Sequence, residues 1–415
     1  MTAVAVLGTC DTKLEELVFL KNAIRGRNRG GTTRLVDVGW RDCEHEEIDV
    51  SRSSLIKDYG KGADTSQMPR SELISFMAQC AAGLLEELYK EQSLHGVVAA
   101  GGSGGTVLAS KAFRSALPIG FPKLVVSTVA SGDTSVLVGE SDVTLMYSVV
   151  DVAGLNRLLA GILTNAAGSI SGMAAAYKAR SELLPQSEAN LKKRVGITMF
   201  GVTTPAVNAI KKHLDSSQQI ETYIFHATGH GGKSMERLVT EGQLDAVLDL
   251  TTTEVCDLVT GGIMAAAPER FDAAIQAEIP TIISLGALDM SNFGPKADIP
   301  EKYRERNLYE HNSLTTLMRT SEEESAEIGR FIAKKLRGTK TPEKTQVWIP
   351  LGESACFPPL AGFLKTAMLI RYYLIRSRKN FKIAGSRPWK INEISTIRGL
   401  QKDIANALIS LLQLN

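Results

Sequence analysis

The stretch Gly96-Val97-Val98-Ala99-Ala100-Gly101-Gly102-Ser103-Gly104-Gly105-Thr106 decides the fold prediction for this chain of 415 residues. An apolar run too short for a helix leads into residues 101–106, here called the glycine loop, and a segment with helical apolar spacing follows. This order predicts a buried strand, a tight turn and a helix. Glycines keep side chains away from the main chain, so the N–H groups at the helix start are able to hold an anion such as phosphate.

Two other interpretations of the glycine loop stay open. The dinucleotide fingerprint G-x-G-x-x-G is not met, because Val107 stands where its third glycine belongs, and no Gly-Lys-Ser/Thr of the common NTPases follows. The pattern G-x-S-x-G does match, with Ser103 at its centre, and is typical of a hydrolase nucleophile between a strand and a helix. The third interpretation is a turn that only lets a strand and a helix pack closely.

Length and composition are typical of a globular protein with two domains. The chain is longer than one hydrophobic core usually serves, and it is 44% hydrophobic and 22% charged. A net charge of +2 predicts no strong field for nucleic acid. Five cysteines without a C-x-x-C pair, no signal-peptide pattern and no long apolar span favour a cytoplasmic protein outside the membrane.

The order of strand, small polar loop and helix recurs along both halves of the chain. Apolar runs that end in loops of Gly, Thr, Ser or Asp lie at 4–7, 124–127, 195–199, 222–225, 246–249 and 281–285. Strands alternating with helices predict doubly wound parallel sheets, with ligand loops at the carboxyl ends of the strands. We expect a first domain at 1–180, a linker at 181–194 and a second domain at 195–415, with an irregular surface excursion at 41–68.

Acidic residues follow several of these strands. They are Asp11, Asp133, Asp249, Glu254 and Asp289. Beside bound phosphate, carboxylates usually hold Mg²⁺ or a ribose, although each is equally suited to cap a helix. A hydrolase triad of Ser103, Asp249 and His311 has the required chain order but needs residues from both halves.

The second half contains one histidine pair and another glycine turn. His226 and His230 are four residues apart, but no glutamate lies between them and glycines surround His230, so the pattern is not that of a zinc protease. The turn at 231–234, with Lys233, is either a second anion site or the cap of the following helix.

Several of these stretches occur together in a known order. They are Gly8-Thr9-x-Asp11-Thr12-Lys13, the glycine loop, Ser127-Thr128-Val129-Ala130-Ser131-Gly132, Met199-Phe200-Gly201-Val202-Thr203-Thr204-Pro205, Phe225-His226-Ala227-Thr228-Gly229, Thr251-Thr252-Thr253-Glu254-Val255 and Gly286-Ala287-Leu288-Asp289-Met290-x-Asn292-Phe293-Gly294-Pro295. The combination resembles the ATP-binding domain family of the tomato mosaic virus resistance protein. The resemblance covers residues 4 to about 354.

The resemblance implies two Rossmann-like domains with a cleft between them, ATP binding chiefly by the first domain, and a homodimer. For the plant member it implies inhibition of tobamovirus RNA replication by binding the helicase region of the viral replication protein. The C-terminal end departs from the family at 352–359 and then carries seven basic residues at 371–390. A solvated face is the usual meaning of such a run, and nucleic-acid contact is a weaker alternative.

We therefore expect an ATP-binding protein, with Mg²⁺ a possible companion of ATP. The predicted ATP-binding residues are Thr9, Asp11, Thr12, Lys13, Arg70, Gly102, Ser103, Gly104, Gly105, Thr106, Thr128, Val129, Ala130 and Ser131. The alternative is an ATP-dependent or hydrolytic enzyme that acts on a small molecule in the cleft, with the 226–236 and 252–254 loops of the second domain facing the first.

Overall fold

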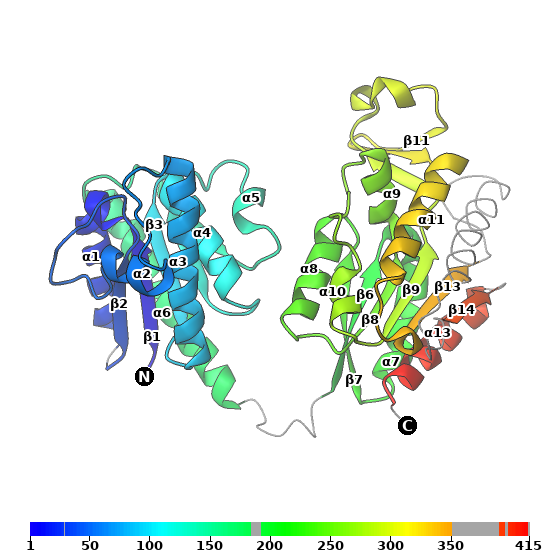
Figure 1. Cartoon of the computed structure of the whole chain (residues 1–415), viewed down its shortest axis with the longest axis horizontal. Helices are drawn as coiled ribbons and strands as arrows, with labels where there is room; N and C mark the ends of the chain where they lie inside the picture. Colours follow the sequence, from blue (N-terminus) through cyan, green and yellow to red (C-terminus); the bar gives the residue numbers. More distant parts are fainter. Residues whose placement is uncertain (29, 184–191, 351–389, 395–396, 414–415) are drawn as a thin grey trace. The chain divides into compact units, whose positions relative to one another are not determined.

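The computed structural model describes residues 1–28, 30–183, 192–350, 390–394 and 397–413 (Figure 1). The chain divides into two compact units, Met1–Gln186 and Ser187–Asn415. The predicted family departure at 352–359 and the basic run through residue 389 lie outside the described residues.

The first unit contains one sheet of five parallel strands in the order β2-β1-β3-β4-β5. The strands are β1 (Ala3–Gly8), β2 (Thr32–Asp37), β3 (Gly96–Gly101), β4 (Lys123–Ser127) and β5 (Thr144–Tyr147). All residues of β3 and β4 are buried, as expected for central strands of a parallel sheet that is covered on both faces.

Helices cover both faces of this sheet. They are α1 (Cys10–Arg27), α2 (Arg52–Tyr59), α3 (Arg70–Lys90), α4 (Ser103–Ala116), α5 (Ser135–Val138) and α6 (Arg157–Leu183). Alternate residues of β1 enter different cores: Val4 and Val6 pack with α1 and α6, and Ala5 and Leu7 pack with α3 and α4. Successive side chains of a strand point to opposite faces of a sheet, so these two cores lie on opposite faces. With helices on both faces, the sheet is doubly wound.

The excursion expected at 41–68 contains the short helix α2. Its start is fixed by Ser51, whose side chain accepts a hydrogen bond from the N–H group of Ser54. Leu55 and Ile56 are its buried apolar residues, and they join the core formed by α3 and α4. Two adjacent apolar residues produce no helical period, so the sequence pattern did not indicate this helix.

The helix α6 continues beyond the expected end of the first domain. It extends to Leu183, and strand β6 begins at Lys193, so both ends of the expected linker belong to regular elements. Among the described residues, α6 is the one helix long and apolar enough to cross a membrane by length and composition. Its Leu163, Ala167 and Ile170 are fully buried against the sheet of the first unit.

The second unit contains a sheet of six parallel strands in the order β14-β13-β9-β8-β6-β7. These strands are β6 (Lys193–Met199), β7 (Ile220–His226), β8 (Ala246–Thr251), β9 (Thr281–Gly286), β13 (Thr345–Pro350) and β14 (Lys390–Ile394). A small antiparallel sheet, in the order β10-β12-β11, consists of β10 (Met290–Phe293), β11 (Leu308–Asn312) and β12 (Thr315–Arg319).

Helices also cover the six-stranded sheet (Figure 1). The α-helices are α7 (Thr204–Asp215), α8 (His230–Thr240), α9 (Thr253–Thr260), α10 (Asp272–Gln276), α11 (Glu322–Leu336) and α13 (Ile397–Leu411), and the 3-10 helices are η2 (Gly201–Thr203), η3 (Lys296–Asp298), η4 (Glu301–Tyr303) and η5 (Pro342–Lys344). Ile404 and Leu408 of α13 pack in the core with Val207 and Ile210 of α7.

The two large sheets share one strand order. In each unit the first strand lies between the second and the third, so the order reverses between β1 and β3 and again between β6 and β8. Open parallel sheets bind ligands beyond the carboxyl ends of the strands at such a reversal, which is called the switch point. The predicted fold class, with two Rossmann-like doubly wound domains, is confirmed.

Candidate functional site

The predicted loops of the first unit meet at its switch point. The glycine loop follows β3, and the neighbouring strands β1 and β4 end in the loops that contain Thr9 and Thr128. The N–H group of Thr128 donates to the carbonyl of Gly101 at 3.3 Å. A Cβ atom added to Gly102 would lie 3.9 Å from the Thr128 hydroxyl oxygen. The structure thus places three of the predicted segments side by side.

The N-terminus of α4 has no cap from a side chain. Gly102 is the N-cap residue, and Ser103, Gly104 and Gly105 form the first turn. Within the described part of the chain, no acceptor contacts the backbone N–H groups of these three residues. Unsatisfied N–H groups and the helix dipole together favour an anion at this place.

Arg70, the first residue of α3, lies beside the glycine loop. A Cβ atom added to Gly104 would be 3.5 Å from a guanidinium nitrogen of Arg70 and 3.6 Å from the ring of Trp40. The guanidinium carbon of Arg70 lies 5.3 Å from the centre of that ring, within the range of a cation–π contact. Among the residues described, no carboxylate pairs with Arg70. Its charge is therefore available to an anion above the start of α4.

Asp11 connects the β1 loop to the loop that carries Trp40. One of its carboxylate oxygens accepts the N–H groups of Trp40 and Arg41, both at 3.2 Å. Its other oxygen is buried and has no hydrogen-bond partner in the described structure. A Cβ atom on Gly39 would lie 2.6 Å from that oxygen, so only glycine allows this approach.

Asp37 fixes the same two loops from inside the protein. It is fully buried, and one carboxylate oxygen accepts the N–H groups of Cys10 at 3.0 Å and Gly39 at 2.9 Å. Burial raises the pKa of Asp37, although these two N–H groups favour its charged form. The nearby charge of Asp11 raises this pKa further.

Other predicted residues are engaged within the protein. The hydroxyls of Thr9 and Thr12 bond to each other at 2.9 Å, and the Lys13 ammonium donates to the Val152 carbonyl. Thr106 is fully buried and its hydroxyl bonds to that of Ser127 at 2.7 Å.

The remaining predicted residues are more open. Ser103 and Ser131 are exposed, Val129 and Ala130 are half-buried, and a Cβ atom on Gly105 would meet no atom within 4 Å. Within the described ranges, no group of three or more His, Cys, Asp or Glu side chains is arranged to hold a metal ion.

The second unit contains a buried ionic cluster. Arg270 is 2% exposed and pairs with Asp249 at 2.6 Å, Glu254 at 3.0 Å and Glu236 at 3.2 Å. These four residues are here called the Arg270 cluster. Burial raises the pKa of both Asp249 and Glu236, against the attraction of Arg270.

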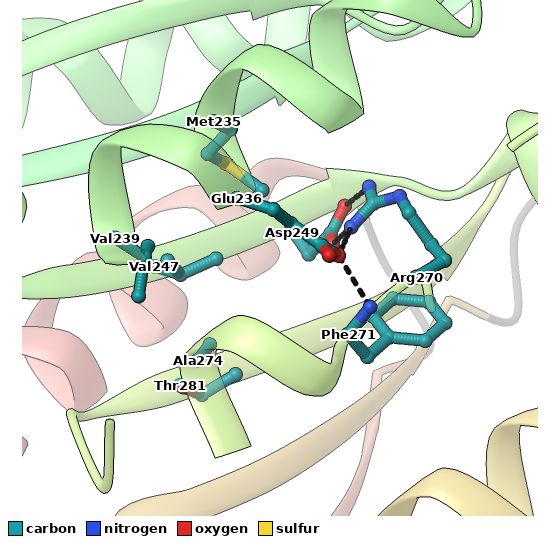
Figure 2. A pocket seen from close by; sticks show the side chains of 9 residues that line it. All are labelled: Met235, Glu236, Val239, Val247, Asp249, Arg270, Phe271, Ala274 and Thr281. Carbon is teal, nitrogen blue, oxygen red and sulfur yellow. Dashed lines mark hydrogen bonds and ion pairs between the residues drawn. The ribbon is translucent and has the colours of Figure 1, made fainter. Parts of the chain in front are cut away.

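A cavity of about 10 Å³ adjoins the Arg270 cluster, with the side chains of Glu236, Asp249 and Arg270 converging on one side of it (Figure 2). This volume accommodates about one water molecule and no substrate.

This cluster corrects the expectations for the acidic loop residues of the second half. Glu254, expected on an open loop, is fully buried. Both carboxylate oxygens of Asp249 bind Arg270, and one also accepts the Thr198 hydroxyl at 2.8 Å, so Asp249 is not available to orient His311 in a triad. Asp289 is also fully buried and pairs with Arg319 at 2.6 Å.

Sequence reasoning missed Trp40, Asp37 and Arg270. Asp37 ends a strand, and this position could have drawn attention to it. Trp40 lies in a polar stretch without period, and Arg270 lies between short helices. Neither residue has a sequence signal, because its partners are distant along the chain.

The fold defines a class of proteins with two tandem Rossmann-like domains, each with a switch point at the carboxyl ends of its strands. Comparison with known proteins then gives the family. Residues 2–179 match the N-terminal domain and residues 192–358 the C-terminal domain of the Uncharacterised protein family (UPF0261). The chain belongs to this family.

Three relatives show how far the similarity extends. A UPF0261 protein of Clostridium tetani is 43% identical over 84% of this chain and 83% of its own length. In Solanum lycopersicum, the ToMV resistance protein Tm-1(GCR237) is 43% identical and the ToMV susceptible protein tm-1(GCR26) is 42% identical, each over 80% of this chain. The chain spans 45% of the length of each tomato protein. The predicted resemblance to the family of the tomato mosaic virus resistance protein is confirmed.

Proposed function

We propose that the first domain binds ATP through its phosphates at the glycine loop. The observation that carries this proposal is the unpaired guanidinium of Arg70 beside the uncapped start of α4. Arginine is suited to phosphate because its planar group donates two parallel hydrogen bonds. The helix N-terminus adds roughly 0.3–1 kcal/mol for a negative group.

Asp11 is suited to a Mg²⁺ ion that accompanies ATP. Its buried oxygen without a partner would serve as a carboxylate ligand in the first turn of α1, just after β1 and next to the strand that carries the glycine loop. Mg²⁺ is usually held by one or two carboxylates together with substrate phosphates and water. When bound, the ion would neutralise phosphate charge that the Asp11 carboxylate otherwise repels. Thr128 and Ser103 offer hydroxyl groups to the same phosphates.

Gly104→Asp tests the ATP site directly. The new carboxylate would lie within reach of Arg70 and of the free N–H groups, so it would take the place of phosphate and repel it. We expect calorimetry to show ATP binding by the wild type and none by this variant. Gly161→Asp is the matched control, because Gly161 is an exposed glycine of α6 with open space around it. Equal ATP affinity of the Gly104→Asp variant and the wild type would rule out the site.

From the tomato relative we further propose a homodimer that binds a viral replication protein through its helicase region. The support is the 43% identity to a protein named for ToMV resistance. This chain is 43% identical to the resistance protein and 42% identical to the susceptible protein. Overall similarity therefore does not show which of the two it resembles in function. Light scattering tests the dimer. A pull-down with a tobamovirus helicase region, with and without ATP, tests the partner, and absence of binding in both conditions would contradict it.

A further inference from the structure

The start of α8 has the features of an anion site, and a side chain of the same chain fills it. Gly229 is the N-cap residue of α8 and has a φ of +86°, a conformation that favours glycine. Glu254 accepts the N–H groups of Gly229 at 2.8 Å and Gly232 at 3.0 Å through one carboxylate oxygen. The negative group that this helix N-terminus favours is therefore the Glu254 side chain of the same chain.

Arg270 binds the other side of the same carboxylate. Its Nε atom donates to the second oxygen of Glu254 at 3.0 Å. A Cβ atom on Gly232 would lie 2.1 Å from that oxygen and 2.8 Å from Arg270 Nε, so residue 232 has to be glycine for the two charged groups to fit. A glycine turn, the N–H groups of Gly229 and Gly232 and a guanidinium thus surround one carboxylate, as they would surround a phosphate oxygen.

The two units place different residues at the same position of the helix after the third strand. In the first unit, β3 ends at Gly101, α4 begins at Ser103, and Gly104 is its second residue. In the second unit, β8 ends at Thr251, α9 begins at Thr253, and Glu254 is its second residue. Gly104 lies next to Arg70, which belongs to the first turn of α3. Glu254 lies next to Arg270 and to the first turn of α8. In each unit, this neighbouring turn begins the α-helix that precedes the third strand.

We infer that Glu254 is a built-in anion that closes the start of α8 to phosphate ligands, while glycine at the corresponding position, Gly104, leaves Arg70 and the start of α4 open. The consequence is one ATP per chain, and this stoichiometry rests on the proposed function. A second consequence is independent of ATP: removal of the Glu254 side chain should leave a site for a small carboxylate between Arg270 and the start of α8.

Calorimetry with the full-length wild type tests the stoichiometry. One ATP per chain supports the inference, and two per chain overturn it. Absence of binding would instead overturn the proposed function, and the next two experiments then decide on the second domain without ATP.

Chemical rescue of Glu254→Gly tests the internal anion. We expect the thermal midpoint of this variant to fall and then to rise with added acetate, because acetate replaces the lost carboxylate and binds only the folded state. Sodium chloride at equal ionic strength is the control for salt. Glu327→Gly is the matched control, since Glu327 is an exposed glutamate of helix α11 in the same unit. A folded Glu254→Gly variant that responds to acetate no more than these controls overturns the inference.

The reverse substitution keeps the inference falsifiable if Glu254→Gly does not fold. Gly104→Glu should reproduce the closed arrangement in the first domain by pairing with Arg70. Its thermal midpoint should exceed that of Gly104→Gln, which has the same size without the charge. Equal midpoints of these two variants overturn the inference that the second residue of this helix acts as an internal anion.

Discussion

Asp257 of helix α9 should make the stability of the protein depend on pH. It is fully buried, and its carboxylate accepts the N–H groups of Asn292 at 2.8 Å and Met264 at 2.9 Å. Burial raises its pKa from 3.8 to about 7, although these hydrogen bonds favour the charged form. A raised pKa of an acid means that the folded state binds the proton more tightly than the unfolded state.

The sign and the size of the effect follow from this shift. Between pH 4 and 7 the folded protein holds a proton that the unfolded chain has released, so the free energy of unfolding decreases as the pH rises. A shift of about three pK units corresponds to about 4 kcal/mol. Above about pH 7 the carboxyl group is ionised in both the folded and the unfolded state, so Asp257 causes no further change of the free energy of unfolding with pH.

The comparison with Asp257→Asn isolates this effect from other titrating groups. Asparagine is neutral at every pH, and loss of one acceptor oxygen should cost roughly 1–3 kcal/mol at low pH. We therefore expect the wild type to be the more stable protein near pH 4, and the difference to shrink or reverse by pH 8. Urea unfolding of the full chain at several pH values, followed by tryptophan fluorescence, measures this difference. If the difference in the free energy of unfolding between the two proteins stays constant from pH 4 to 8, the prediction that Asp257 is a neutral carboxyl group in the folded protein is refuted.

Three further outcomes follow from the contacts around the two sites. Arg270→Met should lower the free energy of unfolding by about 3–5 kcal/mol, because three carboxylates lose their buried partner, and a loss below about 1 kcal/mol in urea unfolding would contradict the cluster. Trp40→Leu should weaken ATP binding roughly two- to fivefold by calorimetry, since the ring no longer holds Arg70, whereas Trp40→Phe should retain part of the affinity. Ser103→Ala should change ATP affinity by less than about tenfold, because the backbone N–H groups remain, and loss of an esterase activity in this variant would instead identify a hydrolase nucleophile.

The sequence predicted the central parallel strands because such strands in a doubly wound fold are buried on both faces. Continuous apolar runs such as 96–100 and 246–248 therefore stand out, and each ends in a loop of small polar residues. The sequence predicted neither β13 and β14 nor the antiparallel strands β10, β11 and β12. The meeting of the Thr9, Gly102 and Thr128 loops follows from strand order, which the alternation of strands and helices makes predictable. Arg70 was predicted as an ATP-binding residue from its place at the start of the helix after the 41–68 excursion, and the structure places it beside Gly104.

Contacts between side chains distant in sequence were not predictable in this way. Glu254 and Asp249 were interpreted as strand-end acids available to a ligand, because nothing in their local sequence reveals Arg270. Trp40 was missed because its partner Arg70 is 30 residues away and belongs to another element. A carboxylate that binds a ligand and one that binds a buried arginine have the same local pattern, and only the fold separates them.

The buried Asp37 carboxylate has a consequence for the energetics of ligand binding. It joins Cys10, the first residue of α1, to Gly39 in the loop after β2 by two hydrogen bonds. These bonds hold the backbone on either side of the proposed site, so little conformational entropy would be lost there on binding of a nucleotide. Ligand affinity at this edge should reflect direct contacts with phosphate rather than the ordering of loops.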